Sequence, residues 1–311
     1  MSGTSRRQGS GSVGPERGAP LKNDLWDIQR VLLWTQGHFK EKGIESSRLE
    51  AELLLSHVLG KDRVYLYTHF DQPLTEGERE AYRTLVKRRA LREPLAYIIG
   101  HREFFSRSFA VSPAVLIPRP ETEHVIEAVL DWLERHPVPT PWILDVGTGS
   151  GIIAVTLACE LKTARIIATD ISEAALSQAR QNAEAHGVAD RIDFVAGDIF
   201  QALSSSTGQR FHVVASNPPY VDLASRAGLQ PEVRDFEPAA ALFADEAGLA
   251  VIRRLCADVG AHLEAPGLFV CEIGFGQRDV VAAAARASGT FETIDFRPDL
   301  QQIPRVLAAS R

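Results

Sequence analysis

Short apolar runs alternate with apolar residues at helical spacing from residue 142 to the end of the chain. This alternation predicts a mostly parallel sheet with helices on both faces, because each helix must cross back over the sheet to reach the next strand. In such folds ligands bind at the carboxyl ends of the strands. The expected strands are 142–146, 165–169, 191–196, 211–216, 268–273, 291–296 and 306–309, and the expected helices are 151–162, 173–186, 248–264 and 277–288.

The first expected strand ends in an acid and enters a turn with three glycines at alternate positions. Glycines permit a tight turn and a close approach of the backbone to a ligand, and amides at a helix start can donate hydrogen bonds. A dinucleotide-binding turn would need a glycine where Ile152 stands. The spacing instead resembles that of S-adenosylmethionine-dependent methyltransferases. The candidate cofactor-binding residues here are Asp145, Gly147, Thr148, Gly149, Ser150 and Gly151.

Two further acids follow expected strands. Asp170 comes at the end of the second strand, where a carboxylate can accept hydrogen bonds from both hydroxyls of a ribose. Asp198, followed by Ile199, comes after the third strand and is expected beside the adenine of the cofactor. Asp198 fits equally well as the N-cap of a helix.

The fourth expected strand stops at the tetrapeptide Asn217-Pro218-Pro219-Tyr220. Prolines cannot donate hydrogen bonds to a sheet, and each holds the residue before it in an extended conformation. Asn217 is therefore expected at the carboxyl end of a strand, where it also reaches the cofactor. A plain turn is the alternative, but the aromatic residue after the prolines and the glycine turn upstream favour a site.

The tetrapeptide resembles the signature of amino-methyltransferases, whose targets are planar nitrogens of base amines or carboxamides. The lone pair of such a nitrogen is delocalised, which makes it a poor nucleophile. The side-chain oxygen of Asn217 and the carbonyl of Pro218 can accept its two N–H bonds and orient it. Pro219 and Tyr220 complete the expected substrate site, with Tyr220 packed against the planar group. No general base is evident, and the proton can leave after methyl transfer.

Residues 21–92 predict a small helical bundle that docks a substrate. Capping boxes are expected at Ser47 and Thr75. The basic residues at 87–89 and 92 indicate either a solvated face or a docking surface for an acidic or nucleic-acid-bearing partner. Residues 1–20 predict a disordered tail, residues 93–118 an extended hairpin linker, and residues 119–311 the α/β domain.

Composition limits the other classes of function. Acidic residues outnumber basic ones, 40 to 34, which argues against stable nucleic-acid binding. Three separated cysteines and nine scattered histidines offer no disulfide framework and no metal site, and they suit a reducing compartment such as the cytoplasm or an organelle. The apolar runs are far shorter than the roughly 20 residues of a membrane span.

The motifs together resemble the HemK/PrmC family from about Asp24 to the C-terminus. The resemblance rests on Pro94, Tyr97, Gly100, Glu103-Phe104, Phe109, the run Leu116–Glu123, the glycine turn and the Asn-Pro-Pro-Tyr tetrapeptide. Members of this family are protein-(glutamine-N5) methyltransferases that act on the Gly-Gly-Gln loop of peptide-chain release factors. The resemblance implies a class I, Rossmann-like methyltransferase fold with a seven-stranded, mostly parallel sheet and an N-terminal helical domain.

The resemblance also implies roles for particular residues. The glycine turn, Asp170, Ile199 and Asn217 would contact S-adenosylmethionine, and the tetrapeptide would bind the glutamine. The chain departs from the family pattern at three positions: Ser106 and Gln302 stand where glycine is usual, and Ile199 stands where some members carry an aromatic residue.

Two alternatives and one open question remain. An N6-adenine or N2-guanine nucleic-acid methyltransferase would use the same tetrapeptide, but with a strongly basic surface. A non-catalytic module that binds ribosomes or release factors would keep the fold. The presence of Asp145, Asp170 and Asn217 argues against such a module. The segment 221–247 is long enough to be a lid. Within it, residues 230–234 and 236–238 would hold the substrate loop, or simply cover the edge of the sheet.

Overall fold

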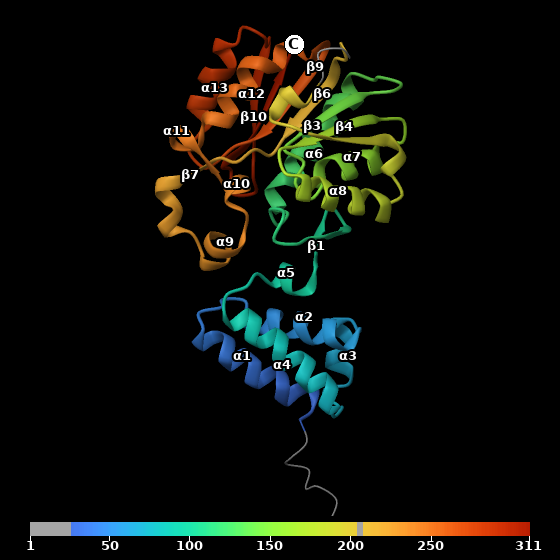
Figure 1. Cartoon of the computed structure of the whole chain (residues 1–311), viewed down its shortest axis with the longest axis vertical. Helices are drawn as coiled ribbons and strands as arrows, with labels where there is room; N and C mark the ends of the chain where they lie inside the picture. Colours follow the sequence, from blue (N-terminus) through green and yellow to red (C-terminus); the bar gives the residue numbers. More distant parts are fainter. Residues whose placement is uncertain (1–25, 204–207) are drawn as a thin grey trace, which may run out of the picture. The chain divides into compact units, whose positions relative to one another are not determined.

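The computed structural model describes residues 26–203 and 208–311 (Figure 1). The chain divides between Leu91 and Arg92 into two units. The tail expected at residues 1–20 lies outside the described residues. Among the helices that the structure describes, none combines the length and the apolar character needed to cross a membrane.

In the described part of the N-terminal unit, the helices are α1 (Ile28–Glu41), α2 (Ser47–Leu59), α3 (Arg63–Thr68) and α4 (Glu76–Ala90). The capping box expected at Thr75 is confirmed, since its hydroxyl accepts from the backbone of Glu78 and its amide donates to the Glu78 carboxylate. The box expected at Ser47 is wrong. Helix α2 begins one residue earlier than that box requires, with Ser46 as an N-cap that makes no side-chain bond. Helix α3 was not expected, because six residues are too few to show a helical period.

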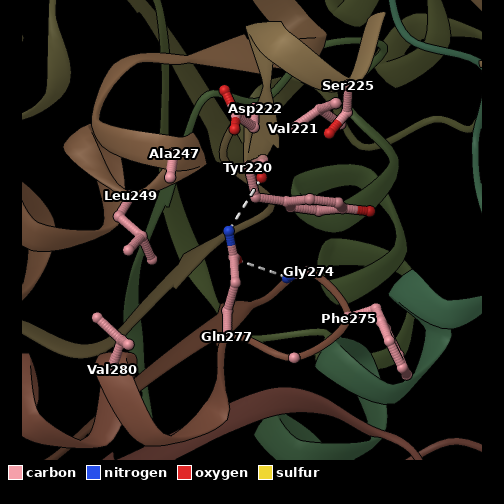
Figure 2. A pocket seen from close by; sticks show the side chains of 11 residues that line it. Tyr220, Val221, Asp222, Ser225, Ala247, Leu249, Gly274, Phe275, Gln277 and Val280 are labelled. Carbon is pink, nitrogen blue, oxygen red and sulfur yellow. Dashed lines mark hydrogen bonds between the residues drawn. The ribbon is translucent and has the colours of Figure 1, made fainter. Parts of the chain in front are cut away.

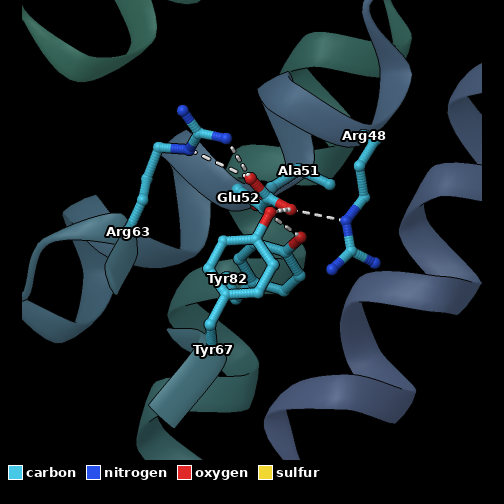
Figure 3. A network of polar contacts seen from close by, with 6 residues as sticks. All are labelled: Arg48, Ala51, Glu52, Arg63, Tyr67 and Tyr82. Carbon is cyan, nitrogen blue, oxygen red and sulfur yellow. Dashed lines mark hydrogen bonds and ion pairs between the residues drawn. The ribbon is translucent and has the colours of Figure 1, made fainter. Parts of the chain in front are cut away.

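A buried carboxylate holds α2 and α3 together (Figure 3). Glu52 is fully buried and accepts hydrogen bonds from Arg63 Nη2 at 2.6 Å and Tyr67 Oη at 2.7 Å. Arg48 Nε is a third donor. Burial alone would raise the pKa of Glu52, but the bonds from Tyr67, Arg63 and Arg48 lower it below the ordinary value. The carboxylate is therefore charged and paired inside the unit.

The second unit contains the expected seven-stranded sheet, in the order β10-β11-β9-β6-β3-β4-β5. Its neighbouring strands from β9 to β5 run parallel, whereas β11 is antiparallel to β9 and β10 is antiparallel to β11. The mostly parallel α/β fold is thus confirmed. The strands are β3 (Trp142–Val146), β4 (Arg165–Asp170), β5 (Ile192–Ala196), β6 (Phe211–Ser216), β9 (Leu263–Glu272), β10 (Thr293–Pro298) and β11 (Pro304–Ser310).

Helices cover both faces of this sheet (Figure 1). Because side chains alternate along a strand, Ile143 of β3 packs with α6 (Glu123–Arg135) and α7 (Ile152–Glu160), while Leu144 packs with α12 (Ala250–Asp258) and α13 (Arg278–Ala287). Helix α8 (Glu173–Ala185) joins the first of these two layers. The helix expected over 248–264 is shorter, since α12 ends at Asp258 in a 3₁₀ turn, η6 (Val259–Ala261).

The segment expected to be an extended hairpin begins with a short helix instead, α5 (Leu95–Ile99). The hairpin follows as β1 (His101–Phe104) and β2 (Arg107–Ala110). Asn182 of α8 fixes β2, because its amide accepts from the Ala110 backbone at 2.8 Å and donates to it at 3.0 Å. A 3₁₀ turn, η2 (Pro120–Thr122), then leads into α6.

The segment between β6 and α12 is built from short elements. Strand β7 (Val221–Asp222) pairs in parallel with β8 (Phe243–Ala244), so the two ends of the segment meet. Between and after them lie η5 (Leu223–Gly228), α9 (Pro231–Phe236), α10 (Ala239–Leu242) and α11 (Asp245–Gly248). The segment therefore closes on itself beside the carboxyl end of β6.

Candidate active site

A cleft of about 430 Å³ opens at the carboxyl ends of β3, β4 and β6. Strand β3 is hydrogen-bonded to β4 on one side and to β6 on the other, so the chain leaves these strands in opposite directions and a crevice forms between the crossovers. The residues expected from the sequence that line it are Gly147, Thr148, Gly149, Ser150, Asp170, Asp198, Ile199, Asn217, Pro218 and Pro219. Asp145, Gly151 and Tyr220 are not among the lining residues.

The glycine turn has the left-handed backbone that its sequence suggests, with φ of +73° at Gly147, +56° at Gly149 and +83° at Gly151. Gly151 serves the fold rather than the cleft. A Cβ at this position would lie 3.0 Å from the Cβ of Ala179, so glycine allows α7 and α8 to pack closely. The amide of Gly149 donates to Asp170 Oδ2 at 2.9 Å and ties the turn to the end of β4.

Asp145 lies beneath the turn and is fully buried. Its Oδ2 accepts from Thr148 Oγ1 at 2.7 Å and from the Ala154 amide at 3.1 Å, which joins the turn to the start of α7. Its Oδ1 is buried and has no partner within the described residues. Burial raises the pKa of Asp145 to about 7.

Asp170 and Asp198 both line the cleft, but their carboxylates have different partners. Each carboxylate oxygen of Asp170 accepts one backbone amide, from Gly149 and Ser172, both at 2.9 Å. A carboxylate oxygen can accept more than one bond, so Asp170 can still bind hydroxyls. Asp198 stands at the N-cap position of η4 (Ile199–Ala202), but its side chain makes no capping bond to that turn, and its carboxylate pairs with Arg254 at 2.7 Å.

The tetrapeptide belongs to a buried hydrogen-bond chain. Asn217 Nδ2 donates to Thr122 Oγ1 at 3.0 Å, and Thr122 Oγ1 donates to Glu272 Oε2 at 2.6 Å. Tyr220 Oη donates to Glu272 Oε1 at 3.0 Å. Within residues 26–203 and 208–311, no group donates to Asn217 Oδ1 or to the Pro218 carbonyl. Both acceptors belong to residues that line the cleft, and no described group occupies them.

Tyr220 lines a neighbouring cavity of about 470 Å³ (Figure 2). Its backbone is held from that side, since Gln277 Nε2 donates to the Tyr220 carbonyl at 3.0 Å and the Gly274 amide donates to Gln277 Oε1 at 2.8 Å. The tetrapeptide is thus fixed by its side chains on one side and by its main chain on the other.

The long segment after β6 is anchored beside the cleft by an ion pair. Glu237 is buried and accepts from Arg119 Nη2 at 2.6 Å and from the Ile117 amide at 3.2 Å. Arg119 lines the cleft itself. The carboxylate of Glu237 is therefore engaged within the protein.

Three residues of this arrangement were not expected from the sequence, namely Thr122, Glu272 and Gln277. Glu272 carried a usable signal, because it is an acid at the end of an apolar strand, as Asp170 is. Thr122 lies in the run Leu116–Glu123 but has no chemistry that marks it alone. The role of Gln277 is visible only in the folded structure.

Solved structures share the fold of this chain at low sequence identity. The catalytic domain of human METTL16 in complex with a MAT2A 3′UTR hairpin matches 73% of this chain and 80% of its own, with 19% identity and a TM-score of 0.53. The N-terminal domain of human METTL16 in complex with SAH matches 76% and 84%, with 18% identity and a TM-score of 0.50. At this level of identity the likeness shows the fold alone.

Sequence relatives are much closer. Residues 30–100 match the PrmC N-terminal domain, and residues 142–258 match a methyltransferase domain. The release factor glutamine methyltransferase of Geobacter sulfurreducens is 43% identical over 86% of this chain and 91% of that protein. The protein of the same name from Koribacter versatilis is also 43% identical, over 88% of this chain and 95% of its own. The chain therefore belongs to the family of release factor glutamine methyltransferases.

Proposed function

We propose that the protein methylates the side-chain amide nitrogen, N5, of the glutamine in the Gly-Gly-Gln loop of release factors, with S-adenosylmethionine as methyl donor. The proposal rests on one observation above all: the cleft presents two acceptors, Asn217 Oδ1 and the Pro218 carbonyl, from adjacent residues of a rigid turn. A primary carboxamide has two N–H bonds, which two such acceptors can bind together.

The cleft fits S-adenosylmethionine. Asp170 offers a carboxylate to a ribose, Ile199 offers an apolar side chain to an adenine, and the glycines at 147 and 149 allow close approach of the backbone. Asp145 holds this turn from beneath, through the bonds that it accepts from Thr148 and Ala154. When bound, S-adenosylmethionine supplies an electrophilic methyl group on a positively charged sulfur.

Asn217 and Pro218 would raise the reactivity of the glutamine by positioning it. Bonds to both N–H groups hold the amide nitrogen in one orientation and favour the form in which the lone pair is localised on nitrogen. The prolines keep these acceptors in place, since neither residue before a proline adopts helical geometry easily. The product nitrogen loses its proton readily, so the chain needs no general base before transfer.

A nucleic-acid substrate is the second candidate, because exocyclic base amines also carry two N–H bonds. The charge balance of 40 acidic to 34 basic residues disfavours it, since affinity for nucleic acid depends on cationic contacts to phosphates. A non-catalytic binding module would have no use for two free acceptors in a cofactor-sized cleft.

Methylation assays with several substrates test the proposal. The protein is incubated with labelled S-adenosylmethionine and either a release factor, the same factor with the loop glutamine changed to glutamate, or total RNA and DNA. We expect label only in the unaltered factor, with one methyl group on the loop peptide by mass spectrometry. Label in nucleic acid, or equal label in both factors, would contradict the proposed substrate.

The N-terminal helical unit is expected to dock the release factor outside the loop. Removal of residues up to Leu91 should then raise KM for the whole factor but leave turnover of a short Gly-Gly-Gln peptide nearly unchanged. Equal loss with both substrates would show that the unit contributes stability rather than recognition.

A further inference from the structure

The buried hydrogen-bond chain behind Asn217 has a direction. Thr122 Oγ1 contacts Asn217 and Glu272 at 3.0 Å and 2.6 Å, but a hydroxyl has only one proton to donate. An ionised Glu272 can only accept, so that proton goes to the carboxylate. Thr122 must then accept from Asn217, and only the Nδ2 end of the amide can donate.

This direction determines which end of Asn217 faces the cleft. With Nδ2 bound to Thr122, Oδ1 points away from this hydrogen-bond chain, and no described residue donates to it. An amide turned by half a rotation would place its N–H groups at the cleft, where they would repel the N–H bonds of a substrate carboxamide. The orientation of the Asn217 amide thus determines whether the cleft offers the substrate a hydrogen-bond acceptor or a donor.

We propose that Thr122 and Glu272 are positioning residues, which orient the Asn217 amide so that its oxygen accepts from the substrate nitrogen. This inference rests on the proposed function for its catalytic consequence, but the orientation itself belongs to the protein without substrate. Glu272 is fully buried at the end of β9, and Tyr220 supplies the second donor to its carboxylate. The carboxylate therefore has a donor on each oxygen and a fixed position.

The charges around Glu272 make the orientation of the Asn217 amide depend on pH. Burial raises its pKa, the bonds from Thr122 and Tyr220 lower it, Glu121 raises it and Arg305 lowers it, with a net rise. A protonated Glu272 could donate to Thr122, which would then donate to Asn217 and reverse the amide. Turnover should therefore fall as the pH drops through the raised pKa of Glu272.

Two variants of Thr122 distinguish the effect of its hydroxyl group from the effect of its side-chain shape. Thr122→Val keeps the size of the side chain but removes the hydroxyl, whereas Thr122→Ser keeps the hydroxyl. We expect Thr122→Val to lower kcat for the release factor by about tenfold to a hundredfold, with little change in cofactor affinity, and Thr122→Ser to stay near wild type. Wild-type kcat in Thr122→Val, or equal losses in both variants, would overturn the proposal.

A measurement without substrate keeps the inference separate from the proposed function. In ¹⁵N spectra the side-chain amide of Asn217, assigned through its loss in Asn217→Ala, should move in Thr122→Val and stay in place in Thr122→Ser. Unchanged signals in Thr122→Val would overturn the orientation even if the enzyme is active. If wild type methylates no release factor while these signals move, only the proposed function fails.

Glu272→Gln provides the test if Thr122→Val does not fold. A glutamine can accept from Thr122 but does not titrate, so we expect a reduced kcat with a weaker dependence on pH on the acid side than in wild type. If kcat falls at low pH in Glu272→Gln as it does in wild type, the pH dependence does not come from Glu272.

Discussion

Gly248 lies so close to the carbonyl oxygen of Tyr220 that a Cβ at position 248 would stand 2.1 Å from it. Its φ of +82° is also one that side chains rarely adopt. Position 248 therefore supports the last residue of the tetrapeptide, together with the bond from Gln277 to the same carbonyl. We therefore expect the positions of the acceptors at 217 and 218 to depend on this close approach.

Gly248→Ala should displace the Tyr220 carbonyl and with it the acceptors at 217 and 218. We expect kcat to fall by about tenfold to a hundredfold, the size of effect that a misplacement of about 1 Å produces. The matched control is Gly289→Ala, because Gly289 has a φ of +64° but a Cβ added there would have nothing within 4 Å. Both variants should lose stability, but only Gly248→Ala should lose turnover; equal kcat values would disprove the support.

Gln302 occupies a left-handed conformation, with φ of +64°, that favours glycine. Gln302→Gly should raise the free energy of unfolding by roughly 0.5–1 kcal/mol, because the strain is relieved at some cost in chain entropy. The neighbouring Gln301 is not among the residues with positive φ. Gln301→Gly should therefore destabilise, and chemical denaturation that shows the same sign for both would refute the explanation.

Asp145 should make the stability of the fold depend on pH. Its pKa is raised from an ordinary 3.8 to about 7 by burial, so its contribution is present below the ordinary pKa and is lost as the pH rises through about 7. A folded-state pKa that differs by one from the unfolded value changes the free energy of unfolding by roughly 1.4 kcal/mol. Relative to wild type, Asp145→Asn should gain stability as the pH rises from about 4 to about 8, measured by denaturation; a constant difference would contradict the raised pKa.

Glu52 should show the opposite sign. Its pKa is lowered by its hydrogen bonds despite burial, so its contribution is present above the ordinary value of 4.5 and is lost as the pH falls below that value. Glu52→Gln should destabilise the N-terminal unit by about 1–3 kcal/mol at neutral pH and by less in acid. The exposed Glu45→Gln is the control, and equal effects of the two variants would show that the buried network is not stabilising.

Much of the fold follows from local pattern. Strands β3 and β6 have the bounds expected from their apolar runs, and the prolines after Ser216 place the tetrapeptide at the carboxyl end of a strand. These features depend on residues that are neighbours in the chain. The left-handed glycines of the turn follow from the same local chemistry.

The rest depends on contacts between distant residues. Thr122 and Glu272 are 150 positions apart, and no periodicity links a hydroxyl at the end of η2 to a carboxylate at the end of β9. The pair Ser46 and Ser47 could each cap α2, and only the backbone of the folded chain selects Ser46. Gly151 resembles its neighbours in the turn, but the approach of Ala179 from α8 gives it a different task.

The central claim is that Asn217 Oδ1 orients the glutamine nitrogen. It is tested most directly by single-turnover methyl transfer to a release factor at saturating cofactor. Asn217→Ala should lower the rate by about 10²–10³-fold, the effect of losing one preorganised partner, while cofactor affinity changes much less. Asn217→Asp, which keeps an acceptor oxygen but adds a charge, should fall between Ala and wild type. A rate in Asn217→Ala equal to that of wild type would contradict the account.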